Sequence, residues 1–158
     1  MLVVGASGGV GSVAVQLVRA AGATVVAPAL PEDEAYLRRL GVRETVPRDG
    51  DIAAAMRERY PDGVDALIDL VSFAPGGYDA ALRPGARVAS TLNAAGDGPG
   101  RTNVNAAPTQ EALRRIADQL AGGGLELPIA ATYDLDDAPA ALAELGDHTQ
   151  GKIAVRVG

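Results

Sequence analysis

Short apolar runs alternate with helical stripes along the whole sequence. The apolar runs predict strands at residues 1–4, 24–27, 44–46, 64–71, 87–91 and 101–106, an extended segment at 127–133 and a last strand at 153–157. Between them, apolar side chains recur at every third or fourth position and predict helices at residues 10–21, 31–40, 52–60, 108–120 and 136–145, with a short helical turn at 78–82. Strands and helices therefore take turns from one end of the chain to the other.

This alternation predicts the fold class. Strands that alternate with helices form right-handed βαβ units, in which the strands lie parallel. The strands read as nearly continuous apolar runs, which is typical of a sheet covered on both faces. We therefore expect an α/β fold, a doubly wound, mostly parallel six-stranded sheet of the Rossmann type with helices on both faces, plus a C-terminal strand. No repeat or long linker divides the sequence, so residues 1–158 are expected to form a single domain.

Several helix ends carry recognisable signals. Pro31 opens the second predicted helix, and Glu32 and Asp33 follow in its first turn, where the helix dipole favours acidic side chains. Asp136 is expected to be the N-cap of the helix at 136–145. These residues are therefore interpreted first as helix-terminal charges and caps.

Composition and charge narrow the function classes. The 158 residues are 47% apolar and 22% charged, which is ordinary globular usage, and no apolar run is long enough to span a bilayer. The start of the chain lacks the basic segment of a signal peptide, so we expect a cytoplasmic protein that does not bind a membrane. The lack of cysteine excludes disulfides, and a single histidine cannot hold a metal alone. A net charge of −6 disfavours binding to nucleic acid.

The segment between the first predicted strand and the first helix carries the candidate chemistry. Gly5, Gly8 and Gly11 form a G-x-x-G-x-x-G pattern there. Glycines at this spacing let the chain turn off the strand, let backbone N–H groups approach a pyrophosphate, and let the helix pack against the strand. The helix N-terminus adds unpaired N–H groups and the positive end of its dipole. A nucleotide-phosphate site is therefore expected, lined by the backbone of Ser7, Gly8, Gly9 and Val10.

Other nucleotide-binding classes share parts of this pattern. Gly5, Gly9 and Gly11 also fit the G-x-x-x-G-x-G motif of short-chain dehydrogenases, but no tyrosine is followed by a lysine four residues later, as those enzymes require. A P-loop ends in G-K-[ST], whereas the only lysine is Lys152. A SAM-dependent methyltransferase has a similar first loop and is disfavoured because Pro28, rather than an acid, follows the second predicted strand.

The motif and the segments after it resemble one family. The stretch GASGGVGSVAVQLVRAAGA closely resembles the cofactor-binding domain of medium-chain dehydrogenases/reductases, with the zinc-free quinone oxidoreductase-like branch nearest. Later segments of that domain are similar, in the same order, to EAYLRRLGV, VDALIDLVS, LRPGARVAST and the C-terminal ATYDLDDAPAALAELGDHTQGKIAVRV. The resemblance covers essentially the whole chain. It does not include the family's N-terminal GroES-like catalytic domain, which is absent from the sequence.

The resemblance implies one half of an oxidoreductase. In the complete enzyme, hydride passes from NADPH to a quinone or an activated alkene in a cleft between two domains, and the cofactor carries the chemistry. This chain is then expected to hold the cofactor, to contribute no catalytic residue and no metal, and to be poorly active alone. A dinucleotide-binding module without turnover of its own is the alternative.

The resemblance also implies which residues meet the cofactor. NAD-dependent members carry an acid at the position of Pro28, and its absence favours NADP(H) over NAD(H). Arg48 is expected to stack on the adenine or pair with a 2′-phosphate, with a solvated loop arginine as the alternative. Residues expected to border the nicotinamide half stand at the ends of the predicted fourth and fifth strands, and one more in the predicted sixth strand is equally consistent with a surface turn: Val71, Thr91, Leu92, Asn93 and Asn105.

The remaining polar residues receive structural interpretations. Asp69 is expected to bond neighbouring backbone, and His148 to be a surface residue because nothing near it completes a dyad. The predicted sixth strand, from Arg101 to Ala106, resembles the edge through which family members dimerise, so a homodimer is expected. The family's last strand pairs within the catalytic domain. Here it is expected either to protrude or to pair locally.

Overall fold

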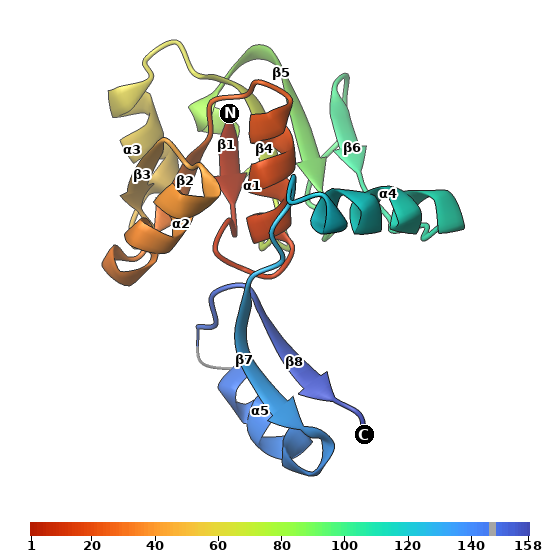
Figure 1. Ribbon diagram of the computed structural model, residues 1–158. Helices are drawn as coiled ribbons and strands as arrows, with labels where there is room; N and C mark the ends of the chain where they lie inside the picture. The colour runs from red at the N-terminus through yellow and green to blue at the C-terminus, as the bar shows by residue number, and fades with distance from the viewer. Residues whose placement is uncertain (146–147) are drawn as a thin grey trace.

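The computed structural model of the protein describes residues 1–145 and 148–158 (Figure 1). Its six-stranded sheet contains β1 (Leu2–Val4), β2 (Val26–Ala29), β3 (Glu44–Pro47), β4 (Val64–Asp69), β5 (Leu82–Ser90) and β6 (Arg101–Asn103). The helices are α1 (Gly11–Ala20), α2 (Glu34–Leu40), α3 (Ile52–Arg59), α4 (Gln110–Ala121) and α5 (Ala138–Leu145), and the last two strands are β7 (Ile129–Asp134) and β8 (Lys152–Arg156). Short 3-10 turns occupy Pro31–Asp33, Asp79–Ala81 and Leu135–Asp137.

The six strands are all parallel, in the spatial order β3-β2-β1-β4-β5-β6. The predicted doubly wound sheet is confirmed. Strands β1 to β3 run outward in one direction and β4 to β6 in the other, so the order reverses between β1 and β4. The carboxyl ends of the strands at this reversal are where such sheets bind ligands.

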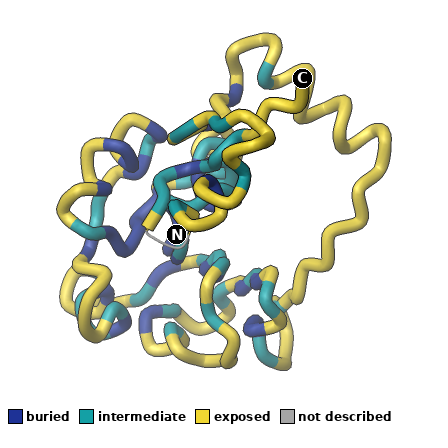
Figure 2. Tube along the Cα trace, turned by 90° about the horizontal axis from the view of Figure 1, so that it is seen from below, coloured by how far each residue is buried: buried dark blue, intermediate teal, exposed yellow. Residues whose placement is uncertain are grey.

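Helices cover both faces of the sheet. Val3 shares a core with residues of α1 and α2, whereas Leu2 and Val4 share the opposite core with α3. Successive side chains of a strand point to opposite faces, and all three residues of β1 are buried. The buried residues come mostly from these strands and from the helices packed on them, and Figure 2 shows the buried segments beside long exposed stretches of the chain. The continuous apolar run at the start of the sequence is therefore a central strand.

The second strand lies slightly later than the sequence predicts, at Val26–Ala29 instead of 24–27. Its pairing with β1 ends at Val26, whose N–H donates to the carbonyl of Met1 at 3.0 Å. Pro28 has no N–H with which to continue that ladder, so the strand goes on beside β3 alone. This places Pro28 near the carboxyl ends of the central strands.

Three other predicted boundaries are corrected. β5 begins at Leu82, ahead of the predicted 87–91, because Leu82 pairs with Val64 before an irregularity in the register. β6 ends at Asn103 and not at 106, because only its first three residues pair with β5. Asp136 is not an N-cap, since it lies inside the 3-10 turn Leu135–Asp137 that precedes α5.

The strands β7 and β8 and the helix α5, which we call the C-terminal unit, stand apart from the large sheet. β7 and β8 pair in parallel as a separate two-stranded sheet with α5 beside it (Figure 1). The last strand therefore protrudes and pairs with β7. Helix α4 has no buried residue, although Leu113 and Ile116 recur at helical spacing. Within the described residues, no helix is long and apolar enough to cross a membrane.

Candidate functional site

A cavity of about 470 Å³ opens at the carboxyl ends of β1, β2 and β4. Its wall contains every residue predicted at the glycine loop, namely Gly5, Ser7, Gly8, Gly9, Val10 and Gly11. Arg48 and Val71, predicted from other parts of the sequence, line it too. Pro28, which the family resemblance associates with the choice of cofactor, lines the cavity as well. The sequence did not point to the other lining residues: Val4, Ile52, Leu70, Tyr78, His148 and Thr149. The loops after β1, β3 and β4 thus converge on one space.

Four predicted cofactor residues lie outside this wall: Thr91, Leu92, Asn93 and Asn105. The chain after β5 folds back on itself, because Ser90 Oγ accepts hydrogen bonds from the N–H groups of Leu92 and Ala94, each at 3.1 Å. Asn93 takes a left-handed conformation there, with a φ of 60°. Asn105 is exposed beyond the end of β6. Their place beside the nicotinamide stays a prediction.

The structure requires glycine at two of the three motif positions, for different reasons. Gly5 has a φ of +83°, and a Cβ there would stand 2.7 Å from Val71 Cγ1. A Cβ on Gly11 would stand 2.0 Å from the carbonyl oxygen of Gly5, so any side chain would push α1 away from β1. A Cβ on Gly8 would meet nothing closer than 3.5 Å. Gly8 is therefore the motif glycine that the packing of the chain alone does not require.

The start of α1 presents hydrogen-bond donors to the cavity. Within the described residues, the N–H groups of Gly9 and Val10 donate to no backbone oxygen, as is usual for the first N–H groups of a helix. Val10 is 59% exposed and is therefore not part of the core. No acidic side chain lies in the first turn of α1. Free donors and the positive end of the dipole favour an anion at this point.

The chain just before β8 lies against the glycine loop. The N–H of Gly151 donates to the carbonyl of Ser7 at 2.8 Å, and Gly8 and Gly151 form an isolated parallel bridge. Lys152 lies over Gly9, since a Cβ built on Gly9 would be 2.9 Å from Lys152 Cγ and 3.0 Å from its Nζ. The only lysine of the chain thus adds a positive charge beside the predicted phosphate site. No local pattern links residues 9 and 152, so the sequence did not reveal this role.

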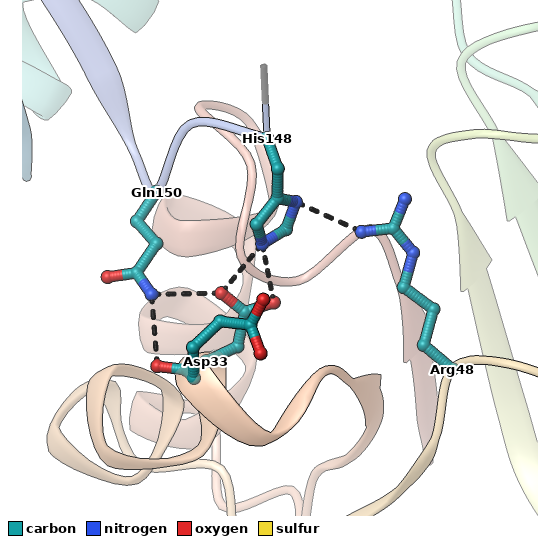
Figure 3. A network of polar contacts seen from close by, with 5 residues as sticks. Asp33, Arg48, His148 and Gln150 are labelled. Atoms are coloured by element: carbon teal, nitrogen blue, oxygen red, sulfur yellow. Dashed lines mark hydrogen bonds and ion pairs between the residues drawn. The ribbon is translucent and has the colours of Figure 1, made fainter.

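His148 belongs to a polar network at the edge of the cavity (Figure 3). Its Nε2 lies 2.9 Å from both carboxylate oxygens of Asp33, and its Nδ1 lies 3.0 Å from Nη1 of Arg48. Gln150 Nε2 donates to Asp33 Oδ1 at 2.9 Å and to the carbonyl of Glu32 at 3.2 Å. Three segments, from before α2, after β3 and before β8, therefore meet through side chains.

This network adds to one expectation and corrects another. Asp33 does lie in the first turn before α2, but its side chain is only 1% exposed and is paired with His148. His148 is exposed, as expected, but the expectation that nothing completes a dyad with it is wrong, because it has a carboxylate partner from 115 positions earlier in the chain. Sequence reasoning considered only neighbouring residues and so missed this pair.

The loop after β4 is fixed by Asp69. Its buried Oδ1 accepts hydrogen bonds from the N–H groups of Val71 at 3.1 Å and Ser72 at 3.0 Å. The predicted structural role of Asp69 is confirmed. It holds Val71 in the cavity wall, next to Gly5.

The residues available to a metal ion are few. Within residues 1–145 and 148–158, no group of three or more His, Cys, Asp or Glu side chains could hold one. The full sequence contains no cysteine and one histidine, and that histidine is bound to Asp33 and Arg48. The donor set of the described chain does not fit a zinc ion.

Solved structures resemble the chain along nearly its full length. The quinone oxidoreductase from Coxiella burnetii matches with a TM-score of 0.85 at 24% identity, over 99% of this chain and 52% of that one. A quinone oxidoreductase from Pseudomonas syringae pv. tomato DC3000 matches at 0.73 and 27%, over 98% and 56%. An NAD-dependent alcohol dehydrogenase matches at 0.78 and 24%, over 99% and 50%. The chain therefore spans about half the length of these structures.

Sequence comparisons give a family. No curated protein sequence matches the chain. A family model described as zinc-binding dehydrogenase matches residues 9–109, which include the end of the glycine loop and the strands β2 to β6. The chain therefore belongs to the zinc-binding dehydrogenase family, in which it is an NAD(P)-binding domain of the medium-chain dehydrogenase/reductase type.

Proposed function

We propose that the chain is the NADP(H)-binding part of a quinone oxidoreductase-like enzyme, which transfers hydride from NADPH to a quinone or an activated alkene. The observation that carries the proposal is the cavity at the carboxyl ends of the central strands, where the free N–H groups of the glycine loop and Arg48 meet and Lys152 lies beside Gly9. The quinone oxidoreductases with the same fold support the substrate class. We also propose a cytoplasmic location, which suits a chain that has no disulfide to form.

Different residues at the cavity would contact different parts of the dinucleotide. The N–H groups of Gly9 and Val10 would meet the pyrophosphate, with the ammonium of Lys152 beside it. Arg48 would meet the adenosine end, close to Pro28. NAD enzymes hold the ribose with an acid at the end of β2, so a proline there and an arginine nearby favour the 2′-phosphate of NADP(H).

The chemistry would come from the cofactor. Bound nicotinamide supplies the hydride, and the protein binds, orients and excludes water. Val71 and Tyr78 contribute an apolar wall to the cavity, and Thr91, Leu92, Asn93 and Asn105 are proposed to border the nicotinamide beyond it. We propose hydride transfer of the zinc-free type, because the glycine-loop segment resembles the zinc-free quinone oxidoreductase-like branch of the family.

Turnover by the chain alone should be very low. It spans about half of the structures it resembles, and the cleft would be closed by the remaining half. Proximity and orientation in a closed site supply about 7–11 kcal/mol of a barrier, which an open site forfeits in large part. We expect oxidation of NADPH, followed at 340 nm with a quinone, barely above background. A separately expressed GroES-like half should raise it. Saturable turnover by the chain alone would contradict this division of labour.

A dinucleotide-binding module without turnover is the alternative function. Both functions predict NADPH binding, so titration does not distinguish them. They differ in whether a GroES-like catalytic domain accompanies this domain. A reading frame for a GroES-like domain directly upstream of Met1 in the DNA would support the enzyme. Unrelated upstream sequence, together with no gain in turnover from any GroES-like half, would support the module.

We also propose that two copies of the chain pair through β6. This strand lies at the edge of the sheet and pairs only with β5, and Val104 directly after it is 45% exposed. An unpaired edge is a template for another strand. Sedimentation should report a dimer that Val104→Pro disrupts, because proline removes a ladder donor. A parent chain that stays monomeric at high concentration would overturn the pairing.

A further inference from the structure

We propose that His148 is a positioning residue that sets the preference for NADPH over NADH by holding Arg48 at the adenosine end of the cavity. The inference rests on the proposed function, because it concerns the same site. It goes beyond it by assigning a role to the Asp33–His148 pair, which the sequence does not suggest.

The hydrogen bonds fix the state of the imidazole ring. A guanidinium group can only donate, so the Nδ1 atom that faces Arg48 Nη1 at 3.0 Å must accept. The ring proton then lies on Nε2, which faces both oxygens of Asp33 at 2.9 Å. His148 therefore links a buried carboxylate to the arginine as a neutral ring with one defined tautomer.

The burial of Asp33 makes the ring a rigid support. Its carboxylate is 1% exposed, and both of its oxygens face Nε2 of His148 at 2.9 Å. A buried carboxylate that engages the ring through both oxygens fixes the orientation of that ring. Figure 3 shows the ring of His148 between Asp33 on one side and Arg48 on the other.

Arg48 is the residue on which selectivity should depend. Among the described residues that line the cavity, it is the only one with a permanent charge, and Pro28 near it brings no acid. NADPH and NADH differ only in the 2′-phosphate. One guanidinium N–H is occupied by His148, so the others stay available for a phosphate in a fixed direction. Holding a flexible side chain in advance reduces the entropy lost on binding.

Three variants separate this role from a structural one. His148→Gln places a donor within reach of Asp33 but has no acceptor at the position of Nδ1, so it keeps one contact and loses the other. Gln150→Ala is the matched control, because it removes a contact to Asp33 and leaves the bond between His148 and Arg48. Arg48→Ala removes the group that is positioned.

The experiment is calorimetric titration of each variant of the full chain with NADPH and with NADH. We expect His148→Gln to weaken NADPH about tenfold, equivalent to about 1.4 kcal/mol, and to leave NADH within about twofold. Gln150→Ala should keep the parent's ratio of the two affinities. Adding His148→Gln to Arg48→Ala should cost nothing further, because His148 acts through the arginine. If the parent and the variants unfold at the same temperature, a change in the ratio of NADPH to NADH affinity does not come from loss of folded protein.

Two results would overturn the role of His148. One is an unchanged NADPH-to-NADH ratio in His148→Gln, and the other is a full additional loss on top of Arg48→Ala. A parent chain that binds neither dinucleotide would overturn the proposed function itself. The two failures are therefore distinguishable in one set of titrations.

Discussion

The first two-thirds of the molecule and its last third are held together by different forces. Residues 1–103 contain the parallel sheet and nearly all the buried apolar side chains. Among the described residues beyond 103, only Leu125, Pro128 and Ala141 are buried apolar residues. Large apolar side chains are exposed along the same stretch: Val104, Leu113, Ile116, Leu127, Ile129, Leu135, Leu142, Leu145, Val155 and Val157. Apolar burial therefore stabilises the sheet region but cannot hold the C-terminal third to it.

Hydrogen bonds make that attachment instead. Gln16 on α1 donates to the carbonyl of Glu126 and accepts from its N–H, both at 2.8 Å. Gly151 is bonded to the glycine loop, and Asp33 receives His148 and Gln150. Most of these contacts surround the cavity. The proposed cofactor site therefore also joins the well-packed sheet region to the C-terminal third, which buries few apolar side chains.

The largest expected effect separates the two regions by stability. Leu37 is fully buried in the core beneath α2, whereas Leu113 on α4 is 59% exposed. We expect Leu37→Ala to cost about 2–5 kcal/mol, because a buried cavity is left behind. Leu113→Ala should cost about 0.5 kcal/mol or less, as is typical of exposed positions. Urea unfolding of both variants measures the difference, and equal losses would mean that α4 is packed in solution.

A smaller effect on stability is expected where the C-terminal third is attached to α1. Gln16→Ala removes both bonds to Glu126, each of which contributes about 0.5–1.5 kcal/mol. Hydrogen exchange should then speed up in the C-terminal unit and stay unchanged in β1. Arg39→Ala is the control, since its exposed ion pair with Glu126 at 3.5 Å is worth about 0–1 kcal/mol. Faster exchange in both regions of Gln16→Ala would contradict a separate attachment.

The smallest expected effect is on alkaline stability. Burial in the sheet region raises the pKa of Tyr36 above its ordinary value, and in the C-terminal unit a hydrogen bond to Glu144 raises the pKa of Tyr133. A phenol with a raised pKa in the folded chain contributes stability that is complete below its unfolded pKa of about 10 and is lost as the pH rises through the folded value.

The two tyrosines therefore give another test of the comparison. Tyr36→Phe should remove part of the loss of stability above pH 10, measured by urea unfolding at successive pH values. Tyr133→Phe should change it less, because that ring is only half-buried and lies in the unit that does not support the core, whereas Tyr36 is buried. If Tyr133→Phe changed the stability above pH 10 more than Tyr36→Phe, the C-terminal unit and not the sheet region would determine alkaline stability.

Local sequence patterns were sufficient to predict the large sheet and the glycine loop. Apolar runs and glycines located every strand of the large sheet, since a central parallel strand such as Leu2–Val4 is apolar on both faces. The observed strand boundaries differ from the predicted ones where a backbone detail sets the end of a pairing. Pro28, for example, ends the pairing of β2 with β1. An Asp at the start of a helix fits both an N-cap and a 3-10 turn, and Asp136 proved to be the second.

The cavity was only partly predictable for a different reason. Gly5, Gly8 and Gly11 are close in sequence, so their spacing reveals their joint role. His148 reaches the cavity, and Lys152 reaches Gly9, only because the chain returns past the glycine loop before β8. No periodicity connects them to Asp33 or Gly9. Pairs more than a hundred residues apart are fixed by topology, and the sequence pattern does not contain that information.

The most direct test of the account is calorimetric titration of the chain with NADPH, NADH and S-adenosylmethionine, together with Gly8→Ala. The apo packing leaves room for a Cβ on Gly8, so this variant should fold normally while its methyl group stands where the pyrophosphate approaches the backbone. Gly124→Ala is the control, since it has ordinary room and does not line the cavity. We predict one NADPH site, weaker binding of NADH, none of S-adenosylmethionine, and a loss of about tenfold or more for NADPH in Gly8→Ala. Absence of dinucleotide binding, or equal NADPH affinity in the parent and Gly8→Ala, would contradict the central claim that the glycine loop holds the cofactor.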